Sequence, residues 1–551
     1  MNSPVAQRAR SFKTLADETF DLLIVGGGIT GCGIARDAAL RGLKVALVEK
    51  NDFASGTSSK SSKLVHGGLR YLEQLEFRLV FESVNERKLL MKRARHLVRP
   101  LPFLVSNYQG DKHWLSTLNL GLWVYEALCG FQAYKLHETF GTRGTLEQEP
   151  TLRADGLRGA IRYYDCLTDD VRLTLENALD ARALGATIVT HAEVGALLRD
   201  SQDRVIGAQV KDVLDGADNR DIEVRARVVV NATGPWSDEV RALLGEPGIL
   251  KPTKGVHLVV DAHRLPARHA WMMTSPRDGR VVFVIPWGLG RTAIGTTDTF
   301  FDGDPDQVHA THADAEYLLE TANHYCPDAK LTFDDVLSTW AGLRPLLKPP
   351  SDAVGASQVS REHMIYERPG FITIAGGKLT TYRRLAKEVL DRAIAQWRDK
   401  LACTTQDRPL PGSEGLDTDA DLEKLAKPLK AKGLSGSVAR YWADTYGTRS
   451  SVLLERTVKD ATALTALDRE LPYLMAQVDE AVEHEQALTL EDVMVRRVPF
   501  LLRAKDQGLG VAETVAARMG QKLQWSDARQ KAELTQYRAE VASSRAYRRA
   551  S

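Results

Sequence analysis

The chain has 551 residues, of which 43% are hydrophobic and 26% are charged, and its formal net charge is +1. This length predicts three or four globular modules of about 150 residues each. A net charge near zero gives no field that would attract nucleic acid, so we expect no nucleic-acid partner. The five cysteines stand singly without CxxC spacing, which predicts neither a zinc site nor a disulfide framework and fits a cytoplasmic protein.

Residues 1–18 are polar and basic and predict a loose helix or a disordered arm, with no signal peptide. Residues 20–50, FDLLIVGGGITGCGIARDAALRGLKVALVEK, then contain a strand, a glycine turn, a helix, a second strand and a terminal acid. Gly26, Gly28 and Gly31 have the G-x-G-x-x-G spacing, which permits a tight turn, close approach of a pyrophosphate, and packing of the helix on the strand. Glu49, 21 residues beyond Gly28, is placed to accept hydrogen bonds from a ribose. The stretch therefore predicts a dinucleotide-binding unit.

The rest of the chain alternates between helical and strand patterns. Residues 74–100 predict a charged helix that ends at Pro100, and the stretch around 186–233 predicts several strands. Residues 251–300 alternate apolar and polar side chains, which is typical of an antiparallel sheet that offers one face to a ligand. After residues 409–415 the composition becomes rich in Ala, Leu, Glu and Arg with helical periodicity, so we expect a domain boundary there.

Two distant glycine motifs favour FAD over NAD as the dinucleotide. A predicted strand runs into residues 231–234, NATG, and a second runs into Gly376 and Gly377. Thr380 and Thr381 follow as acceptable N-cap residues of a helix whose positive end would stabilise negative charge on a reduced flavin. Three separated glycine approaches to one elongated ligand suit an extended FAD.

Several strings together resemble the FAD-dependent glycerol-3-phosphate dehydrogenases of aerobic bacteria, within the D-amino-acid-oxidase-like superfamily. These strings are GGGITGCGIARDAALRGLKVALVEK, SGTSSKSSKLVHGGLRYLE, NATGPW, GLRPL and GGKLTTYR, and they occur in consistent order over residues 19–400. HGGLRYLE together with GGKLTTYR is specific to that family.

The resemblance implies an α/β fold with a Rossmann-like FAD-binding domain, an inserted antiparallel-sheet substrate domain and an all-α C-terminal domain. After an N-terminal arm, 1–18, we expect the FAD-binding domain to span 19–405, in the pieces 19–100, 165–235 and 335–405. The inserted domain then comprises 101–164 and 236–334, and the helical domain 406–551. The resemblance assigns the cofactor to Gly26, Gly28, Gly31, Glu49, Thr57, Ser58, Ser62, Lys63, Leu64, Val194, Ala232, Thr233, Gly234, Gly377, Lys378, Leu379 and Thr380.

The implied substrate, glycerol 3-phosphate, needs cations for its phosphate and a base for its hydroxyl proton. Arg70 and Arg344 are the phosphate candidates, because a guanidinium presents paired donors, and Tyr71 would add a hydroxyl. Lys378 would contact the substrate or the flavin. His66 and His257 are alternative bases, and for each a structural role weighs equally. The implied reaction removes the C2 hydroxyl proton by a histidine and transfers hydride to the flavin, which yields dihydroxyacetone phosphate.

The family resemblance further implies a membrane quinone as electron acceptor and a peripheral location on the inner face of the cell membrane. Monotopic contact would need exposed apolar residues, but a core role explains the candidate segment equally well. That segment contains Trp114, Leu115, Leu118, Leu122, Trp123 and Tyr125, near Lys112 and His113; the basic C-terminus with Arg538, Arg545, Arg548 and Arg549 is a second candidate.

Three rival functions remain open at the level of sequence. The nearest is a glycerol-phosphate oxidase that reduces oxygen to hydrogen peroxide. A flavin amine or hydroxy-acid oxidase would recognise a carboxylate instead of a phosphate, and a catalytically silent flavoprotein would act through a partner. The C-terminal region is compatible with an oligomer interface such as that of a homodimer, with a membrane face, and with a cap over the FAD-binding domain.

Overall fold

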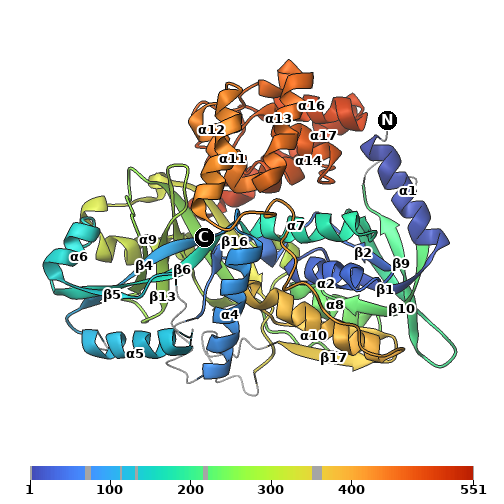
Figure 1. Ribbon diagram of the computed structural model, residues 1–551, viewed down its shortest axis with the longest axis horizontal. Coiled ribbons are helices and arrows are strands. Elements are labelled where there is room, and N and C mark those ends of the chain that lie inside the picture. The colour runs from blue at the N-terminus through green and yellow to red at the C-terminus, as the bar shows by residue number, and fades with distance from the viewer. Residues whose placement is uncertain are drawn as a thin grey trace.

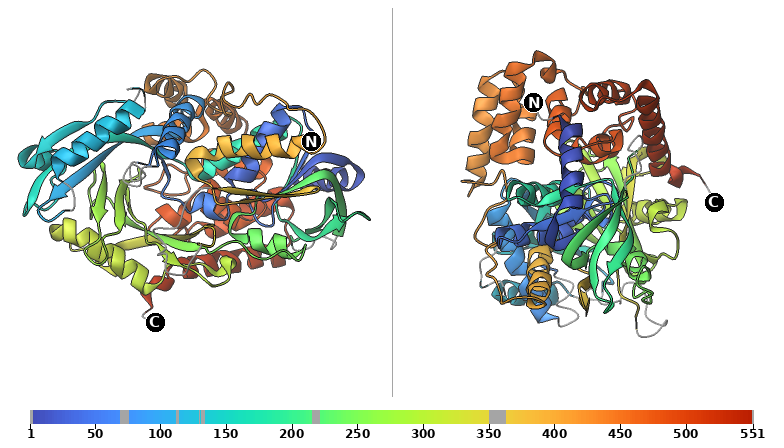
Figure 2. Two further views of the ribbon diagram at one scale, coloured as in Figure 1. Left: turned by 90° about the horizontal axis from the view of Figure 1, so that it is seen from below. Right: turned by 90° about the vertical axis from the view of Figure 1, so that its right-hand side faces the viewer.

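The computed structural model describes residues 3–68, 76–111, 114–128, 130, 134–214, 221–349 and 363–549. Two β-sheets lie side by side, and a helical C-terminal domain covers both from one side (Figure 1). Figure 2 shows the same arrangement from two further directions. The expected fold class is confirmed.

The first sheet is built around parallel strands with the order β17-β18-β10-β1-β2-β7. Its parallel members are β1 (Thr19–Val25), β2 (Val45–Val48), β7 (Thr187–Val189), β10 (Asp221–Asn231) and β18 (Phe371–Ala375). Antiparallel strands β8 (Ala192–Arg199), β9 (Val205–Asp212) and β17 (Met364–Arg368) extend it. Because β10 pairs with β1 so that Asn231 lies opposite Val25, the NATG turn emerges beside the first glycine turn.

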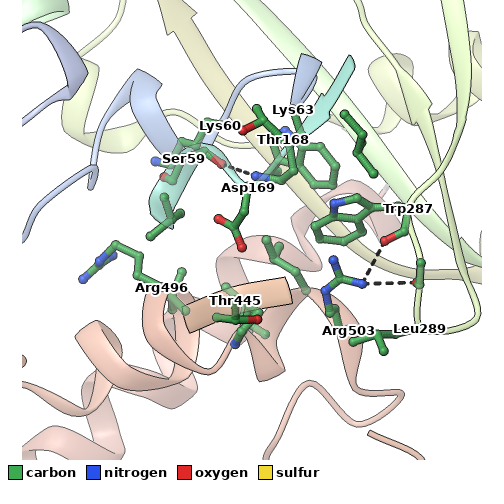
Figure 3. Close-up of a pocket in the computed structure, with 18 of the residues that line it drawn as sticks. Ser59, Lys60, Lys63, Thr168, Asp169, Trp287, Leu289, Thr445, Arg496 and Arg503 are labelled. Atoms are coloured by element: carbon green, nitrogen blue, oxygen red, sulfur yellow. Dashed lines mark hydrogen bonds between the residues drawn. The ribbon is translucent and has the colours of Figure 1, made fainter. Parts of the chain in front are cut away.

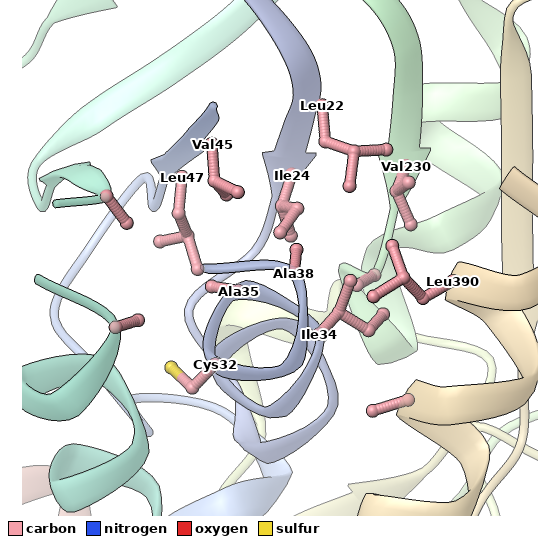
Figure 4. Close-up of a cluster of buried hydrophobic side chains, with 14 of the residues drawn as sticks. Leu22, Ile24, Cys32, Ile34, Ala35, Ala38, Val45, Leu47, Val230 and Leu390 are labelled. Carbon is pink, nitrogen blue, oxygen red and sulfur yellow. The ribbon is translucent and has the colours of Figure 1, made fainter. Parts of the chain in front are cut away.

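Helix α2 (Ile29–Leu40) packs tightly against this sheet, with Ile34, Ala35 and Ala38 fully buried against strand residues such as Ile24 and Leu47 (Figure 4). A Cβ on Gly31 would lie 1.9 Å from the carbonyl oxygen of Gly26, so only glycine permits this approach. Helices α7 (Asp170–Ala183) and α10 (Tyr382–Ala395) bury the same face. Helix α1 (Pro4–Asp17) and the β8–β9 hairpin contribute to the core on the other face. Residues 4–17 thus form a packed helix.

The second sheet has ten strands, mostly antiparallel, in the order β15-β11-β14-β13-β12-β4-β6-β3, with β16 paired to β11 and β5 to β6. Helix α9 (His312–Tyr325) packs on one face, and α4 (Phe77–Arg93) and α5 (Leu115–Leu128) pack on the other. The strands are β3 (Leu64–Val65), β4 (Val98–Tyr108), β5 (Glu138–Gly141), β6 (Leu157–Thr168), β11 (Thr253–Asp261), β12 (Ala270–Thr274), β13 (Val281–Pro286), β14 (Arg291–Gly295), β15 (Thr299–Phe300) and β16 (Val336–Arg344).

One sequence expectation is corrected here. The helix expected to end at Pro100 ends at Arg93, and Pro100 lies in β4. A proline fits there because β4 pairs with its second neighbour, β12, only from Phe103 onward, so an N–H is not needed on that side. The domain bounds remain predictions; within the piece expected from about residue 335, β16 hydrogen-bonds along β11 of the second sheet.

In the described part of the C-terminal domain the regular elements are helices, with one isolated β-bridge between Ala466 and Leu474, and the domain has two apolar cores. Its α-helices are α11 (Asp419–Ala431), α12 (Gly436–Tyr446), α13 (Ser450–Lys459), α14 (Met475–Glu483), α15 (Phe500–Arg503), α16 (Ala512–Leu523) and α17 (Asp527–Ser544). Between α14 and α15 lies a π-helix, η10 (Asp492–Arg497). In the described residues no helix has the length and apolarity needed to span a bilayer.

Candidate active site

A cavity of about 550 Å³ opens where β1, β2 and β10 end. The glycine turn lines it, and Gly26 has a φ of 111°, a conformation that glycine adopts without strain. A Cβ on Gly26 would lie 2.7 Å from the carbonyl oxygen of Ala232, so the two turns touch through backbone alone. Such an open cradle of backbone at a helix N-terminus fits a pyrophosphate.

Glu49 forms the wall of this cavity at the end of β2. Its Oε2 accepts a hydrogen bond from the Gly27 N–H at 2.6 Å, and its Oε1 accepts one from the Asn51 N–H at 2.8 Å. Burial raises the pKa of Glu49 despite these donors. The carboxylate is therefore fixed beside the glycine turn, where the sequence places a ribose acceptor.

A second cavity of about 420 Å³ continues from the first. Thr57, Ser61, Pro345 and the turn 376–379 line both, so the two form one elongated space. Among the expected cofactor residues, those that line it are Gly26, Gly28, Glu49, Thr57, Ser58, Ser62, Leu64, Val194, Ala232, Thr233, Gly234, Gly377, Lys378, Leu379 and Thr380. This shape and lining fit an extended FAD.

Arg344 lies in the second cavity at the end of β16, with its side chain 23% exposed. Its guanidinium donates to Oδ1 of Asp298 at 3.0 Å, to the Thr296 hydroxyl at 3.1 Å and to the Thr297 carbonyl at 3.3 Å. Asp298 and Thr296 are site residues that sequence reasoning missed, because no local motif marks them. Asp298 and Thr296 hold the guanidinium group of Arg344 in one orientation at the cavity wall.

His257, on β11, also lines the second cavity but is only 2% exposed. Its ring stacks on Trp340 with centroids 4.7 Å apart, and its Nε2 lies 2.9 Å from the Ser62 hydroxyl. Burial, aided by the charges of Arg344 and Lys63, holds the pKa of His257 well below its usual range. The imidazole is therefore neutral at pH 7, and the same surroundings make it a weaker base than a free histidine.

His66 is exposed and lines the same cavity as His257. Its backbone N–H donates to the Thr380 hydroxyl at 3.2 Å, and that hydroxyl lies 3.4 Å from the His66 carbonyl. Thr381 stands at the N-cap position of α10, as expected, but neither Thr380 nor Thr381 makes a side-chain capping bond at η7 (Leu379–Thr381) or α10. Thr380 instead ties the 376–380 turn to His66.

The side chain of Lys63, which was expected at the cofactor, lies in a third cavity of about 360 Å³, between the second sheet and the helical domain (Figure 3). There its Nζ donates to Oδ1 of Asp170 at 2.7 Å and to the Ser59 carbonyl at 2.8 Å. Gly31 lines none of these three cavities and acts through packing. Arg70 and Tyr71, together with Lys112 and His113, lie outside the described residues.

Comparison with family models defines the class of this fold and cavity. A model described as FAD dependent oxidoreductase matches residues 21–383, and one described as the C-terminal domain of alpha-glycerophosphate oxidase matches residues 403–530. The class is thus that of FAD-dependent oxidoreductases, and the expectation of FAD as cofactor is confirmed.

Individual relatives narrow this class. The chain is 38% identical to "Aerobic glycerol-3-phosphate dehydrogenase" of Staphylococcus haemolyticus, covering 88% of this chain and 87% of that protein. It is 40% identical to "Glycerol-3-phosphate dehydrogenase 2" of Mycobacterium tuberculosis, over 97% and 90% of the two chains. The solved structure of the glycerol-3-phosphate dehydrogenase from Bacillus halodurans complexed with FAD matches with a TM-score of 0.82, 32% identity and 99% coverage of both chains. The chain belongs to the family of FAD-dependent glycerol-3-phosphate dehydrogenases.

Proposed function

We propose that this protein oxidises sn-glycerol 3-phosphate to dihydroxyacetone phosphate with FAD as the bound cofactor. The observation that carries the proposal is the single elongated space, which has the glycine turns and Glu49 at one end and Arg344 with His257 at the other. A cationic fork and a neutral imidazole in one wall suit a phosphate ester that carries an alcohol.

In this proposal each residue has a defined task. Arg344, oriented by Asp298, binds the substrate phosphate, and Arg70 and Tyr71 are proposed to add further donors. His257 accepts the C2 hydroxyl proton, while Ser62 orients its ring through the bond at Nε2. Lys378 contacts the substrate or the flavin at the shared wall of the two cavities. Bound FAD supplies the hydride acceptor for C2.

Replacement of Arg344 by Ala tests the phosphate site. A lost charged hydrogen bond of about 1.5–3 kcal/mol corresponds to roughly a 10- to 100-fold rise in KM. The flavin absorbance of the purified variant should remain that of wild type, because Arg344 lies at the substrate end. An unchanged KM would remove Arg344 from the phosphate site.

The proposed reaction itself is tested by anaerobic addition of glycerol 3-phosphate to the holoenzyme. We expect bleaching of the flavin absorbance, with no bleaching by amino acids or by hydroxy acids that lack a phosphate. Flavin that stays oxidised with glycerol 3-phosphate would exclude the proposed activity and favour the silent flavoprotein. Bleaching by amino acids alone would instead indicate an amine oxidase.

We further propose a membrane quinone as acceptor and a peripheral position on the inner face of the membrane. Helix α5 supports a monotopic contact, since Leu120 is 65% exposed and Trp123 46% exposed, whereas Leu122 and Tyr125 are buried. Trp114, just before this helix, is 66% exposed. Peroxide formed per turnover, measured with and without added quinone, separates this proposal from the oxidase alternative; stoichiometric peroxide that quinone does not suppress would favour the oxidase.

A further inference from the structure

The loop that follows Glu49 is tied to the C-terminal domain through Asp52, a fully buried carboxylate. Arg497 donates to both oxygens of Asp52, at 2.5 and 2.8 Å, and Arg496 adds a third bond at 2.5 Å. Both arginines are themselves buried. Two adjacent arginines of a distant domain thus converge on one carboxylate three residues beyond the expected ribose acceptor.

The arginines belong to the π-helix η10, a rare element that often marks functional sites. The backbone around Asp52 in turn supports the glycine turn, because the Ala54 N–H donates to the Gly27 carbonyl at 3.1 Å. Ala54 itself has a φ of 59°, which a fixed loop must impose on a residue other than glycine. A continuous path of bonds therefore joins η10 to the turn that receives the pyrophosphate.

The same π-helix holds a second wall of the dinucleotide cavity through Asp492 and His191. The Oδ2 of Asp492 lies 3.0 Å from Nε2 of His191. The His191 N–H donates to the Asn51 carbonyl at 2.7 Å, and the next N–H, of Ala192, donates to the Glu49 carbonyl at 2.8 Å. Residues at both ends of η10 thus hydrogen-bond to the loops that follow β2 and β7. These loops line the cavity at Glu49, Asn51 and Ala192.

We propose that η10 is a positioning clamp for the adenosine end of the FAD site, in which Arg497 acts through Asp52. Docking of the helical domain and binding of FAD are then thermodynamically coupled, each strengthening the other. This inference rests on the proposed FAD site and gives the C-terminal domain a role in cofactor retention. It does not depend on which substrate is oxidised.

The test measures the dissociation constant of FAD by titrating apoprotein, freed of flavin, with FAD and following flavin fluorescence. We expect R497Q and D52N each to raise this constant at least tenfold. R497Q removes two of the three arginine bonds to Asp52, and D52N removes the negative charge between two buried arginines. Affinity for ADP, which probes only the adenosine end, should fall by a similar factor. The double variant should be little worse than either single one, since both remove the same interaction.

R518Q is the matched control, because Arg518 makes a comparable two-bond pair with the buried Asp479, at 2.7 Å for each bond, wholly within the helical domain. It should leave both dissociation constants within twofold of wild type. Equal weakening by R518Q, or wild-type FAD affinity in R497Q and D52N, would overturn the clamp. If R497Q does not fold, R497K serves instead, since it keeps the charge and loses the paired geometry. Failure of glycerol 3-phosphate to bleach the flavin would reject the proposed activity without altering these affinities.

Discussion

At the scale of single residues, the chemistry depends on His257 and on what surrounds it. The ring is buried between Trp340 and Gly295, and a Cβ on Gly295 would lie 2.2 Å from its Cδ2. This confinement and the Ser62 bond fix the orientation of the imidazole, and this geometry, not the lowered pKa, is the reason to prefer it. His66 is exposed and is held to Thr380 through its backbone. We therefore favour His257 as the proposed base.

Replacement of His257 by Gln should slow flavin reduction by glycerol 3-phosphate by about 10²- to 10⁴-fold, the usual contribution of a general base. Anaerobic stopped-flow absorbance measures this step apart from reoxidation. S62A, which removes only the orienting hydroxyl, should cost less, and H66Q should leave the rate within about tenfold of wild type. A larger loss in H66Q than in H257Q would exchange the two assignments.

The sequence predicts individual site residues where a motif is local, and fails where the partner is distant. The spacing of Gly26, Gly28 and Glu49 was sufficient to place them in one cavity. The side-chain position of Lys63 could not be predicted, because its partner, Asp170, lies 107 residues away and holds the ammonium group in another cavity. Asp298 escaped notice for the same reason, since it meets Arg344 only through strand pairing of the second sheet.

At the scale of elements, periodicity predicted strands around residues 22–48, 186–233 and 251–300 and before Gly376, but not which sheet each strand joins. Residues 336–344 lie in a piece of chain that we expected in the FAD-binding domain. These residues form β16, and the pairing of β16 with β11, a long-range contact, places Arg344 in the second cavity, at the proposed substrate end. The local sequence pattern does not indicate which sheet this strand joins, because its apolar side chains could be buried equally well in either sheet.

The approach of α2 to β1 gives a prediction at this scale. G31A would introduce a Cβ 1.9 Å from the Gly26 carbonyl oxygen, so the helix must shift from the glycine turn. We expect at least a tenfold weaker affinity for FAD and a lower melting temperature, measured by flavin titration and thermal unfolding. G121A in α5 is the control, because nothing lies within 4 Å of its Cβ. Alanine there should be neutral or stabilising by up to about 1 kcal/mol. Wild-type FAD affinity in G31A would contradict the packing argument.

At the scale of the whole molecule, buried histidines join the domains and respond to pH with opposite signs. His96 is fully buried, with its Nδ1 2.7 Å from the Ser413 hydroxyl at the entrance to the helical domain. Burial, with the nearby Arg449 and Arg172, holds the pKa of His96 well below its usual range. His191 is different: burial opposes its charged form, yet Asp492 raises its pKa.

Linkage converts these directions into a stability prediction. The pKa of His96 in the unfolded chain is about 6.5. Below this pH the unfolded chain binds a proton at His96 while His96 in the folded protein stays neutral, so acid lowers the free energy of unfolding. The H96Q variant lacks this acid-dependent loss of stability. The free energy of unfolding of H96Q, relative to wild type, should therefore rise by about 1 kcal/mol between pH 6.5 and 5.5.

His191 has the opposite effect, because its stabilising contribution is complete below pH 6.5 and is lost as pH rises through the raised pKa of the folded state. The free energy of unfolding of H191Q, relative to wild type, should accordingly decrease as pH falls toward 6.5. Denaturant titrations at pH 6.5 and 5.5 measure the H96Q difference, and titrations at pH 8.5 and 6.5 measure the H191Q difference. A change of the same sign in the two variants as pH falls would contradict the assigned signs.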